Sequence, residues 1–109
     1  MSISEERVNK ALAYLVESAD KAAGARAERL YLEEFTKHLK ARMMTEGAME
    51  GMSLGAQERQ ACASNAYRTH LEGLRAAIEA DEQYRYRREA ESALVEAYRT
   101  FSANTRVVR

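Results

Sequence analysis

The feature that most constrains this chain is the absence of proline from all 109 residues. Proline ends or kinks α-helices, so a chain without it and with only 5 Gly has few positions at which a helix must stop. Trp is also absent, Val and Ile are scarce, and the strong helix formers Ala, Glu, Arg and Leu dominate the composition. The sequence therefore predicts an all-α protein.

Apolar residues that recur every three or four positions, together with capping residues and glycines, divide the chain into segments. We expect helices at about residues 3–17, 20–46, 56–63 and 65–102, with a Gly/Met loop at 47–55. Ser2 and Glu5 have the spacing of a capping box for the first helix. Ser18 favours a break before the second helix, although the alanines that follow would also suit one continuous helix. Ser64 or Asn65 is expected to cap the last helix.

The length of the chain corresponds to a single helical domain. Its two long helices are expected to form a long antiparallel hairpin, with the short N-terminal helix beside it. Two helices are too thin a layer to hide both apolar faces, so we expect a homodimer that completes the bundle. The alternative is a monomeric three-helix bundle in which the first helix covers the seam.

Charge and targeting signals narrow the class of protein. Lys plus Arg and Asp plus Glu both number 17, and this balance argues against a polybasic nucleic-acid coat. No apolar run approaches the length of a membrane span, and the first residues lack the basic and apolar pattern of a signal peptide. The single cysteine, Cys62, has no internal disulfide partner. We therefore expect a cytoplasmic protein without membrane association.

One segment combines arginine and tyrosine in a way that favours binding. It consists of Tyr84, Arg85, Tyr86, Arg87 and Arg88. Guanidinium groups pair with phosphates or carboxylates, and tyrosine rings stack on bases, so the segment is a candidate partner-binding or nucleic-acid-binding surface. Carboxylates surround it on the same helix, so a ladder of ion pairs along the helix is the competing interpretation.

The Gly/Met loop supplies a second candidate contact. Met49, Met52 and Leu54 are too apolar for a connecting loop, so we expect them to fold back on the helices or to contact a partner.

The residue types that could support catalysis or metal binding do not form a motif. His38 and His70 lie on different long helices, and the Glu-x-x-His spacing of di-metal bundles is absent at both. Cys62 lies between two alanines, which favours a buried thiol over a catalytic one. The glycines of the loop lack the spacing of a phosphate-binding loop. The sequence predicts a protein that is not an enzyme and uses no cofactor or metal.

Three segments resemble small uncharacterised all-helical proteins of tailed phages and prophages. They are Lys21–Phe35 (KAAGARAERLYLEEF), Tyr67–Arg75 (YRTHLEGLR) and Glu96–Asn104 (EAYRTFSAN). The resemblance spans most of the chain and implies an accessory protein, encoded among early, replication or recombination genes, that acts in the bacterial cytoplasm. It assigns no catalytic residue.

Two functions are compatible with these observations. The first is a non-enzymatic phage-type accessory protein that presents an elongated helical surface to a phage or host protein. The alternative is a nucleic-acid-binding accessory of phage DNA replication or recombination that uses the Arg/Tyr cluster. Affinity for nucleic acid would fall steeply with salt, which separates the two.

Overall fold

The computed structural model describes residues 2–108 of the chain, and the side chains of residues 2–105. Four α-helices account for nearly all of this part: α1 (Glu5–Glu17), α2 (Ala19–Met49), α3 (Leu54–Ala63) and α4 (Asn65–Val108). No strand occurs among the described residues, so the expectation of an all-α protein is confirmed. None of these helices combines the length and the apolar character that crossing a bilayer requires.

The chain divides into two compact units. The terminal unit contains the first 24 residues and the chain from Asp81 onward; the central unit is Ala25–Ala80. Both long helices contribute to both units: residues 19–24 of α2 belong to the terminal unit and the remainder of α2 to the central unit.

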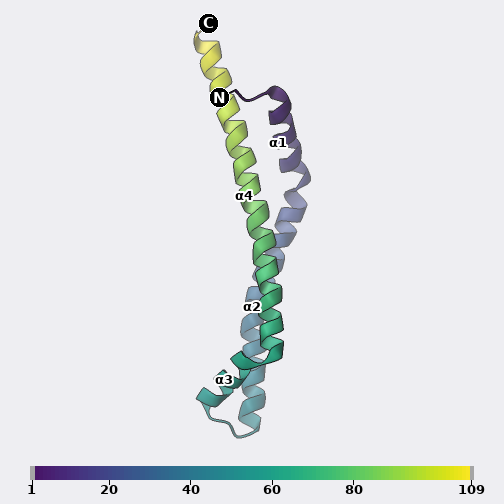
Figure 1. Cartoon of the computed structure of the whole chain (residues 1–109), viewed down its shortest axis with the longest axis vertical. Coiled ribbons are helices and arrows are strands. Elements are labelled where there is room, and N and C mark those ends of the chain that lie inside the picture. The colour runs from purple at the N-terminus through teal and green to yellow at the C-terminus, as the bar shows by residue number, and fades with distance from the viewer. Residues whose placement is uncertain (1, 109) are drawn as a thin grey trace. The chain divides into compact units, whose positions relative to one another are not determined.

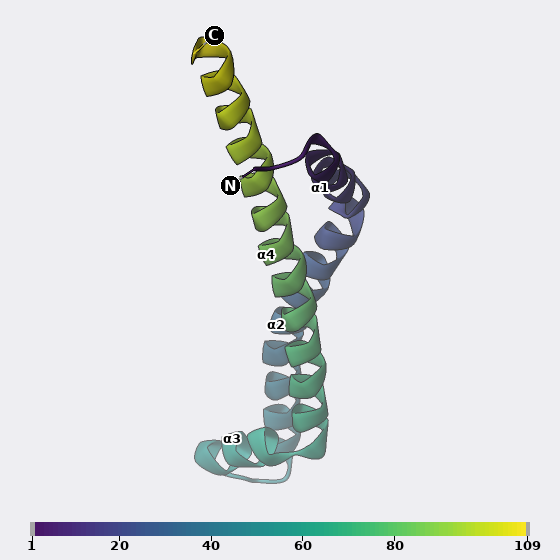
Figure 2. The ribbon, with the colours of Figure 1, turned by 45° about the horizontal axis from the view of Figure 1, so that its top comes forward.

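In the central unit, α2 and α4 run antiparallel (Figures 1 and 2). Thr36 of α2 contacts His70 of α4, while Met43, further along α2, contacts Ser64 at the start of α4. The buried residues here include Leu39 of α2, 5% exposed, and Ala61 of α3, 1% exposed. Because the buried residue of α3 is an alanine, whose side chain is only a methyl group, α3 can approach its neighbours closely.

In the terminal unit, α1 packs antiparallel to the C-terminal part of α4. Arg7, near the start of α1, pairs with Glu91, and Tyr14, near its end, contacts Arg87. Val8 and Ala11, four and seven residues after the N-cap, face α4 as one helical stripe and are 6% and 1% exposed. The buried layer is therefore thin, and ion pairs and arginine contacts supplement it.

The first helix begins later than predicted. The N-cap is Ser4, whose Oγ accepts a hydrogen bond of 3.1 Å from the Arg7 amide, so the capping box from Ser2 does not start the helix. Glu5 and Glu6 then lie in the first turn, where the helix dipole favours acidic side chains. The predicted break after the first helix is confirmed, since α1 ends at Glu17 and α2 starts at Ala19.

The Gly/Met loop is shorter than the predicted 47–55, because α2 continues to Met49 and α3 starts at Leu54. Among residues 2–108, only Gly51 has a positive φ, 81°, and its amide donates a hydrogen bond to the Ala48 carbonyl just after α2 ends. Gly47 is helical and buried, and a Cβ built there would lie 3.2 Å from both Met52 Sδ and Gln57 Cγ. The missing side chain at position 47 therefore lets the loop and α3 pack against α2.

The last helix is longer than predicted. It starts at Asn65 with Ser64 before it, whose Oγ accepts from the Tyr67 amide at 3.1 Å, and it continues to Val108 rather than ending near 102. The segment at which the helix is predicted to end, Ser102 to Thr105, includes no Gly or Pro, and Thr105 donates its hydroxyl hydrogen to the Phe101 carbonyl within the helix. Polar residues alone did not stop it.

Candidate functional site

Arg88, one of the predicted site residues, holds the junction between α1 and α2. Its guanidinium Nη1 donates hydrogen bonds of 2.7 Å to the Leu15 carbonyl oxygen and of 2.7 Å to Ser18 Oγ. Ser18 is the junction residue and is only 5% exposed, so water has little access to its hydroxyl. Arg88 therefore donates hydrogen bonds to acceptors within its own unit and stabilises the fold there.

Arg85 belongs to the predicted ladder of ion pairs along α4. It lies 3.5 Å from Glu82 and 3.4 Å from Glu89, and its guanidinium carbon is 5.5 Å from the Tyr86 ring centroid. The charge of Glu82, followed by the hydrogen bond to Glu89, raises the pKa of Arg85. Two carboxylates on the same helix thus compete with any external anion for this arginine.

Arg87 differs from its two neighbours in the cluster. Its guanidinium carbon lies 3.9 Å above the centroid of the Tyr14 ring, a cation–π stack between α4 and α1. Among the described residues it makes no hydrogen bond and no ion pair. The stack fixes the position of the guanidinium while its N–H donors remain available at its edge.

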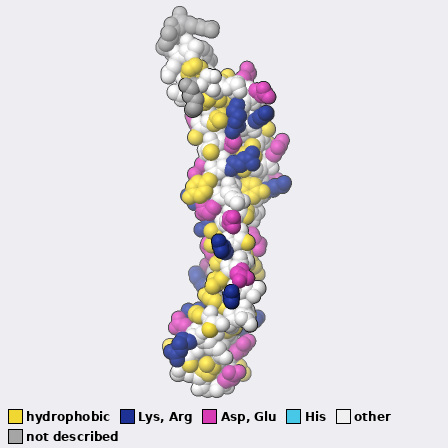
Figure 3. Space-filling view, viewed as in Figure 1, with side chains coloured by type: hydrophobic (Ala, Val, Ile, Leu, Met, Phe, Trp, Pro, Cys, Tyr) yellow, Lys and Arg dark blue, Asp and Glu magenta, His cyan; other side chains and the backbone are white. Residues whose placement is uncertain are grey.

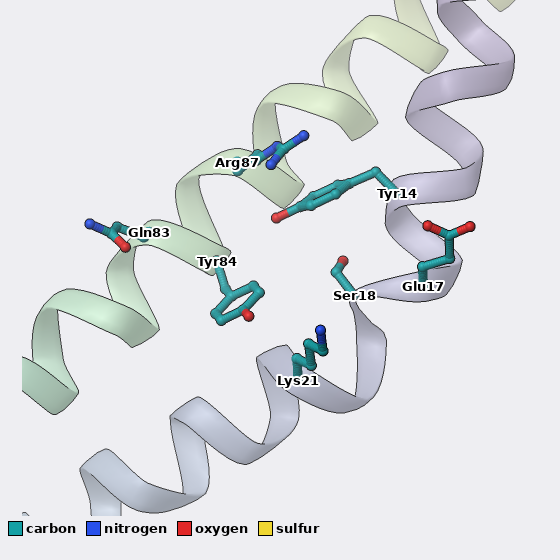
Figure 4. A pocket seen from close by; sticks show the side chains of 7 residues that line it. All are labelled: Tyr14, Glu17, Ser18, Lys21, Gln83, Tyr84 and Arg87. Carbon is teal, nitrogen blue, oxygen red and sulfur yellow. The ribbon is translucent and has the colours of Figure 1, made fainter.

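Arg87 also lines an open groove of the terminal unit with a volume of about 520 Å³. The lining residues are Tyr14, Glu17, Ser18, Lys21, Gln83, Tyr84 and Arg87. Figure 4 shows the Tyr14 and Tyr84 rings and the Lys21 side chain directed into the space between the helices, whereas Gln83 and Glu17 point away from it. The groove brings two residues of the predicted cluster, Tyr84 and Arg87, next to the end of α1 and the start of α2, which the sequence analysis did not single out.

An ion pair that no sequence motif predicts anchors α1 to α4. Arg7 Nη2 and Nη1 donate to the two carboxylate oxygens of Glu91 at 2.8 Å and 2.9 Å. The hydrogen bond from Arg7 lowers the pKa of Glu91 below its usual range and that from Glu91 raises the pKa of Arg7. Glu91 is 8% exposed, so this bidentate pair is shielded on the carboxylate side.

The two histidines belong to an aromatic cluster of the central unit. His70 Nε2 lies 2.6 Å from Thr36 Oγ1 and 3.1 Å from the Leu32 carbonyl oxygen. The Phe35 ring is 5.3 Å from the His70 ring and 5.7 Å from the His38 ring, between centroids. In residues 2–105 no group of three or more His, Cys, Asp or Glu is placed to hold a metal ion.

Cys62 is exposed, so the expectation of a buried thiol is wrong. Its neighbour Ala61 occupies the inward position on α3 instead, at 1% exposure.

The predicted apolar residues of the loop separate into two kinds. Met49, at the end of α2, is 84% exposed, and Leu54, at the start of α3, is 70% exposed. Met52 is half-buried because its thioether lies against Gly47, and its carbonyl accepts a hydrogen bond of 2.8 Å from Gln57 Nε2. Met52 therefore folds back on α2, whereas Met49 and Leu54 are exposed, and their contact with a partner stays a prediction.

A third exposed surface follows the outward face of α4 in the terminal unit. Tyr86, Ala90, Ala93, Ala97 and Phe101 are all exposed and fall on one side of the helix at intervals of three or four residues. Tyr86 is 61% and Phe101 58% exposed. We call this set the α4 outer stripe. Ala93 and Ala97 also border a mainly apolar groove of about 540 Å³ beside the N-terminal segment Ser2–Ser4.

The charged side chains around these surfaces are of both signs and are mixed. Figure 3 shows basic and acidic side chains interspersed with hydrophobic ones over the face in view. This pattern agrees with the net charge of zero and gives no broad basic patch on that face.

Comparison with protein-family models, with curated proteins and with solved structures finds no match for this chain.

Proposed function

We propose that this chain is a non-enzymatic accessory protein, of the phage type that the sequence resembles, which forms a homodimer and binds a phage or host protein in the bacterial cytoplasm. The observation that carries the proposal is the position of its large apolar side chains. Those at least 42% exposed are Leu12, Val16, Leu30, Tyr31, Met49, Leu54, Leu71, Tyr86 and Phe101. By contrast, no large side chain among the described residues is fully buried.

This distribution supports association rather than catalysis. Burying apolar surface gains roughly 25 cal/mol per Å², so side chains of this size left in water represent free energy that a partner can recover. Single exposed apolar residues are ordinary on any surface, but the α4 outer stripe places several on one helical face. A helix of a second copy packs favourably on such a face, because its small central residues permit close approach.

The α4 outer stripe is our proposed dimer surface. Its two aromatic ends flank three alanines, and the adjacent groove of about 540 Å³ is large enough to accept an aromatic side chain. The exposed pair Met49 and Leu54, in the other unit, is the proposed contact for a protein partner. Together they would give the protein one surface for itself and one for its target.

Light scattering after size-exclusion chromatography tests the dimer. We expect the mass of a dimer for the unmodified chain and of a monomer for Ala93→Glu, because a carboxylate in an apolar helix interface is costly. Ser92→Glu is the matched control, since Ser92 is exposed, adjacent in sequence and outside the stripe. A monomeric wild type, or equal masses for both variants, would reject the stripe as the dimer surface.

The alternative, a nucleic-acid-binding accessory of phage replication or recombination, has less support. It depends on the arginines of residues 84–88, and two of these have partners within the protein. The same chromatography with a short single-stranded and a duplex oligonucleotide checks it. Co-elution that is lost at high salt would favour the alternative over protein binding.

A further inference from the structure

Two arginines of the Arg/Tyr cluster, Arg87 and Arg88, are covered by groups that carry no charge. The Arg87 guanidinium stacks on the Tyr14 ring of α1 (Figure 4), and Arg88 donates to the Leu15 carbonyl and to Ser18 Oγ. Among the described residues, neither arginine makes an ion pair or a hydrogen bond with a carboxylate. Their positive charges are therefore held by α1 and its junction with α2 but are not neutralised there.

The other arginines of the terminal unit differ in this respect. Those whose side chains are described each lie against a carboxylate oxygen, at 2.8 Å, 3.4 Å and 3.1 Å: Arg7, Arg85 and Arg99. Glu91, with which the charge of Arg87 also interacts, already accepts hydrogen bonds from Arg7 at both of its oxygens. A phosphate would bind Arg87 or Arg88 more strongly than a carbonyl, a hydroxyl or a ring does, because both partners are then charged.

The contact between α1 and α4 leaves much of the apolar surface of α1 uncovered. Val8 and Ala11 are the buried residues of this helix, whereas Leu12 is 44% and Val16 is 78% exposed. The helix has 13 residues, and Ser18 separates it from α2. Because so short a helix depends on packing for its stability, α1 can separate from α4 as one segment that turns at Ser18.

We propose that α1 is a displaceable cover of the Arg/Tyr cluster and that single-stranded nucleic acid is the ligand that displaces it. When α1 separates, Tyr14 leaves the Arg87 guanidinium and the acceptors at the α1–α2 junction leave Arg88. Both guanidinium groups then bind phosphates, and Tyr84, half-buried beside the start of α2, offers a ring to an unpaired base. A duplex keeps its bases stacked inside, so the tyrosine favours the single strand.

The proposal goes beyond the dimer and the protein partner of the proposed function. Tyr84, Arg87 and Arg88 all belong to the terminal unit, and none of them is part of the α4 outer stripe. The monomer-forming variant Ala93→Glu should therefore bind nucleic acid like the wild type. Failure of the dimer and failure of the cover are in this way distinguishable.

Fluorescence anisotropy of a short labelled oligodeoxythymidine tests the cover in the full-length chain. Ala11→Glu places a carboxylate at a position 1% exposed between α1 and α4 and should open α1. We expect it to bind at least about tenfold more tightly than the wild type, whose affinity is reduced because only a fraction of its molecules is open. Ala13→Glu is the matched control, since it adds the same charge at an exposed position of α1 and should bind like the wild type.

Two further substitutions locate the binding in the cluster. Arg87→Gln in the Ala11→Glu background should remove the gain in affinity, whereas Arg99→Gln, which removes an exposed cation outside the cluster, should preserve it. If circular dichroism shows that Ala11→Glu loses more helix than α1 contains, Arg7→Gln replaces it as the opening variant. That substitution removes the bidentate pair with Glu91 and leaves the buried apolar residues intact.

Hydrogen exchange of the wild type gives a result that binding to the closed surface would not produce. A ligand that binds the open form must populate it, so a saturating oligonucleotide should speed amide exchange in Glu5–Glu17 and leave the part of α2 in the central unit unchanged. Unchanged or slower exchange in α1 would overturn the displacement. Equal affinity of the wild type and the opening variant, a gain that survives Arg87→Gln, or equally tight binding of polyglutamate would also overturn the proposal.

Discussion

Replacing Arg88 with alanine should destabilise the protein far more than replacing its neighbour Arg87. Arg88 donates two hydrogen bonds of 2.7 Å each, to the Leu15 carbonyl and to Ser18 Oγ. Hydrogen bonds to charged groups contribute about 1.5–3 kcal/mol, and Arg88 is only half-buried, so we expect a loss of about 2 kcal/mol. The main contact of Arg87 is a cation–π stack at an exposed position, which is worth about 0.5–1 kcal/mol.

Thermal unfolding followed by circular dichroism measures the difference. For a chain of this length 1 kcal/mol corresponds to roughly 4 °C, so Arg88→Ala should lower the melting temperature by about 8 °C and Arg87→Ala by about 2–4 °C. Ser18→Ala in the Arg88→Ala background should cost less than in the wild type, because the shared hydrogen bond is already lost. Equal shifts for the two arginine variants, or additive effects of Arg88 and Ser18, would refute the structural role of Arg88.

Three further variants report on other parts of the fold. Gly73→Ala should stabilise the protein by about 1 kcal/mol, because position 73 is helical with open space around a Cβ, whereas Gly51→Ala should destabilise it, because φ is 81° there; denaturant midpoints compare the two. Glu91→Gln should lower the melting temperature at pH 7, since the Arg7 hydrogen bond depresses the pKa of Glu91 and its stabilisation is fully present above the unfolded pKa of about 4.3. That difference should shrink as the pH falls below this value, and a constant difference down to pH 3 would contradict the role of the carboxylate charge. Leu39→Ala should cost about 2–4 kcal/mol by denaturant titration, because Leu39 is 5% exposed; a loss under 1 kcal/mol would mean that position 39 lies outside the core.

The sequence was sufficient to predict helices, because the signals for them are local. Capping by Ser64 and the break near Ser18 each depend on a few consecutive residues. The extent of the Gly/Met loop was not predictable in the same way. Gly47 and Gly51 cannot be distinguished by their sequence context, yet Gly47 provides space for α3 and Gly51 provides a positive φ. Only the packing of α3 against α2 distinguishes them.

Only some of the residues that line the candidate groove could be predicted from the sequence, for a related reason. Composition singled out Tyr84 and Arg87 because charge and aromatic character coincide there. Apart from Gln83, the residues that complete the groove, such as Lys21, lie more than 60 positions away in the chain and carry no motif. The competing interpretation of the arginine cluster was also partly correct, since Arg85 does form a ladder of ion pairs while Arg88 is tied to α1. Residue type alone could not distinguish the different contacts of Arg85, Arg87 and Arg88.

Among residues 2–105, the two least exposed hydrophobic residues are Ala11 and Ala61, each 1% exposed, and alanine is the smallest hydrophobic residue type. In a core filled by large side chains, truncation is the damaging change and leaves a void. Here the helices meet over methyl groups, so enlargement is the damaging change, and even valine at either position would force two backbones apart. We therefore expect a saturation library to find Ala11 and Ala61 among the least tolerant positions, although alanine is a residue type that usually accepts substitution.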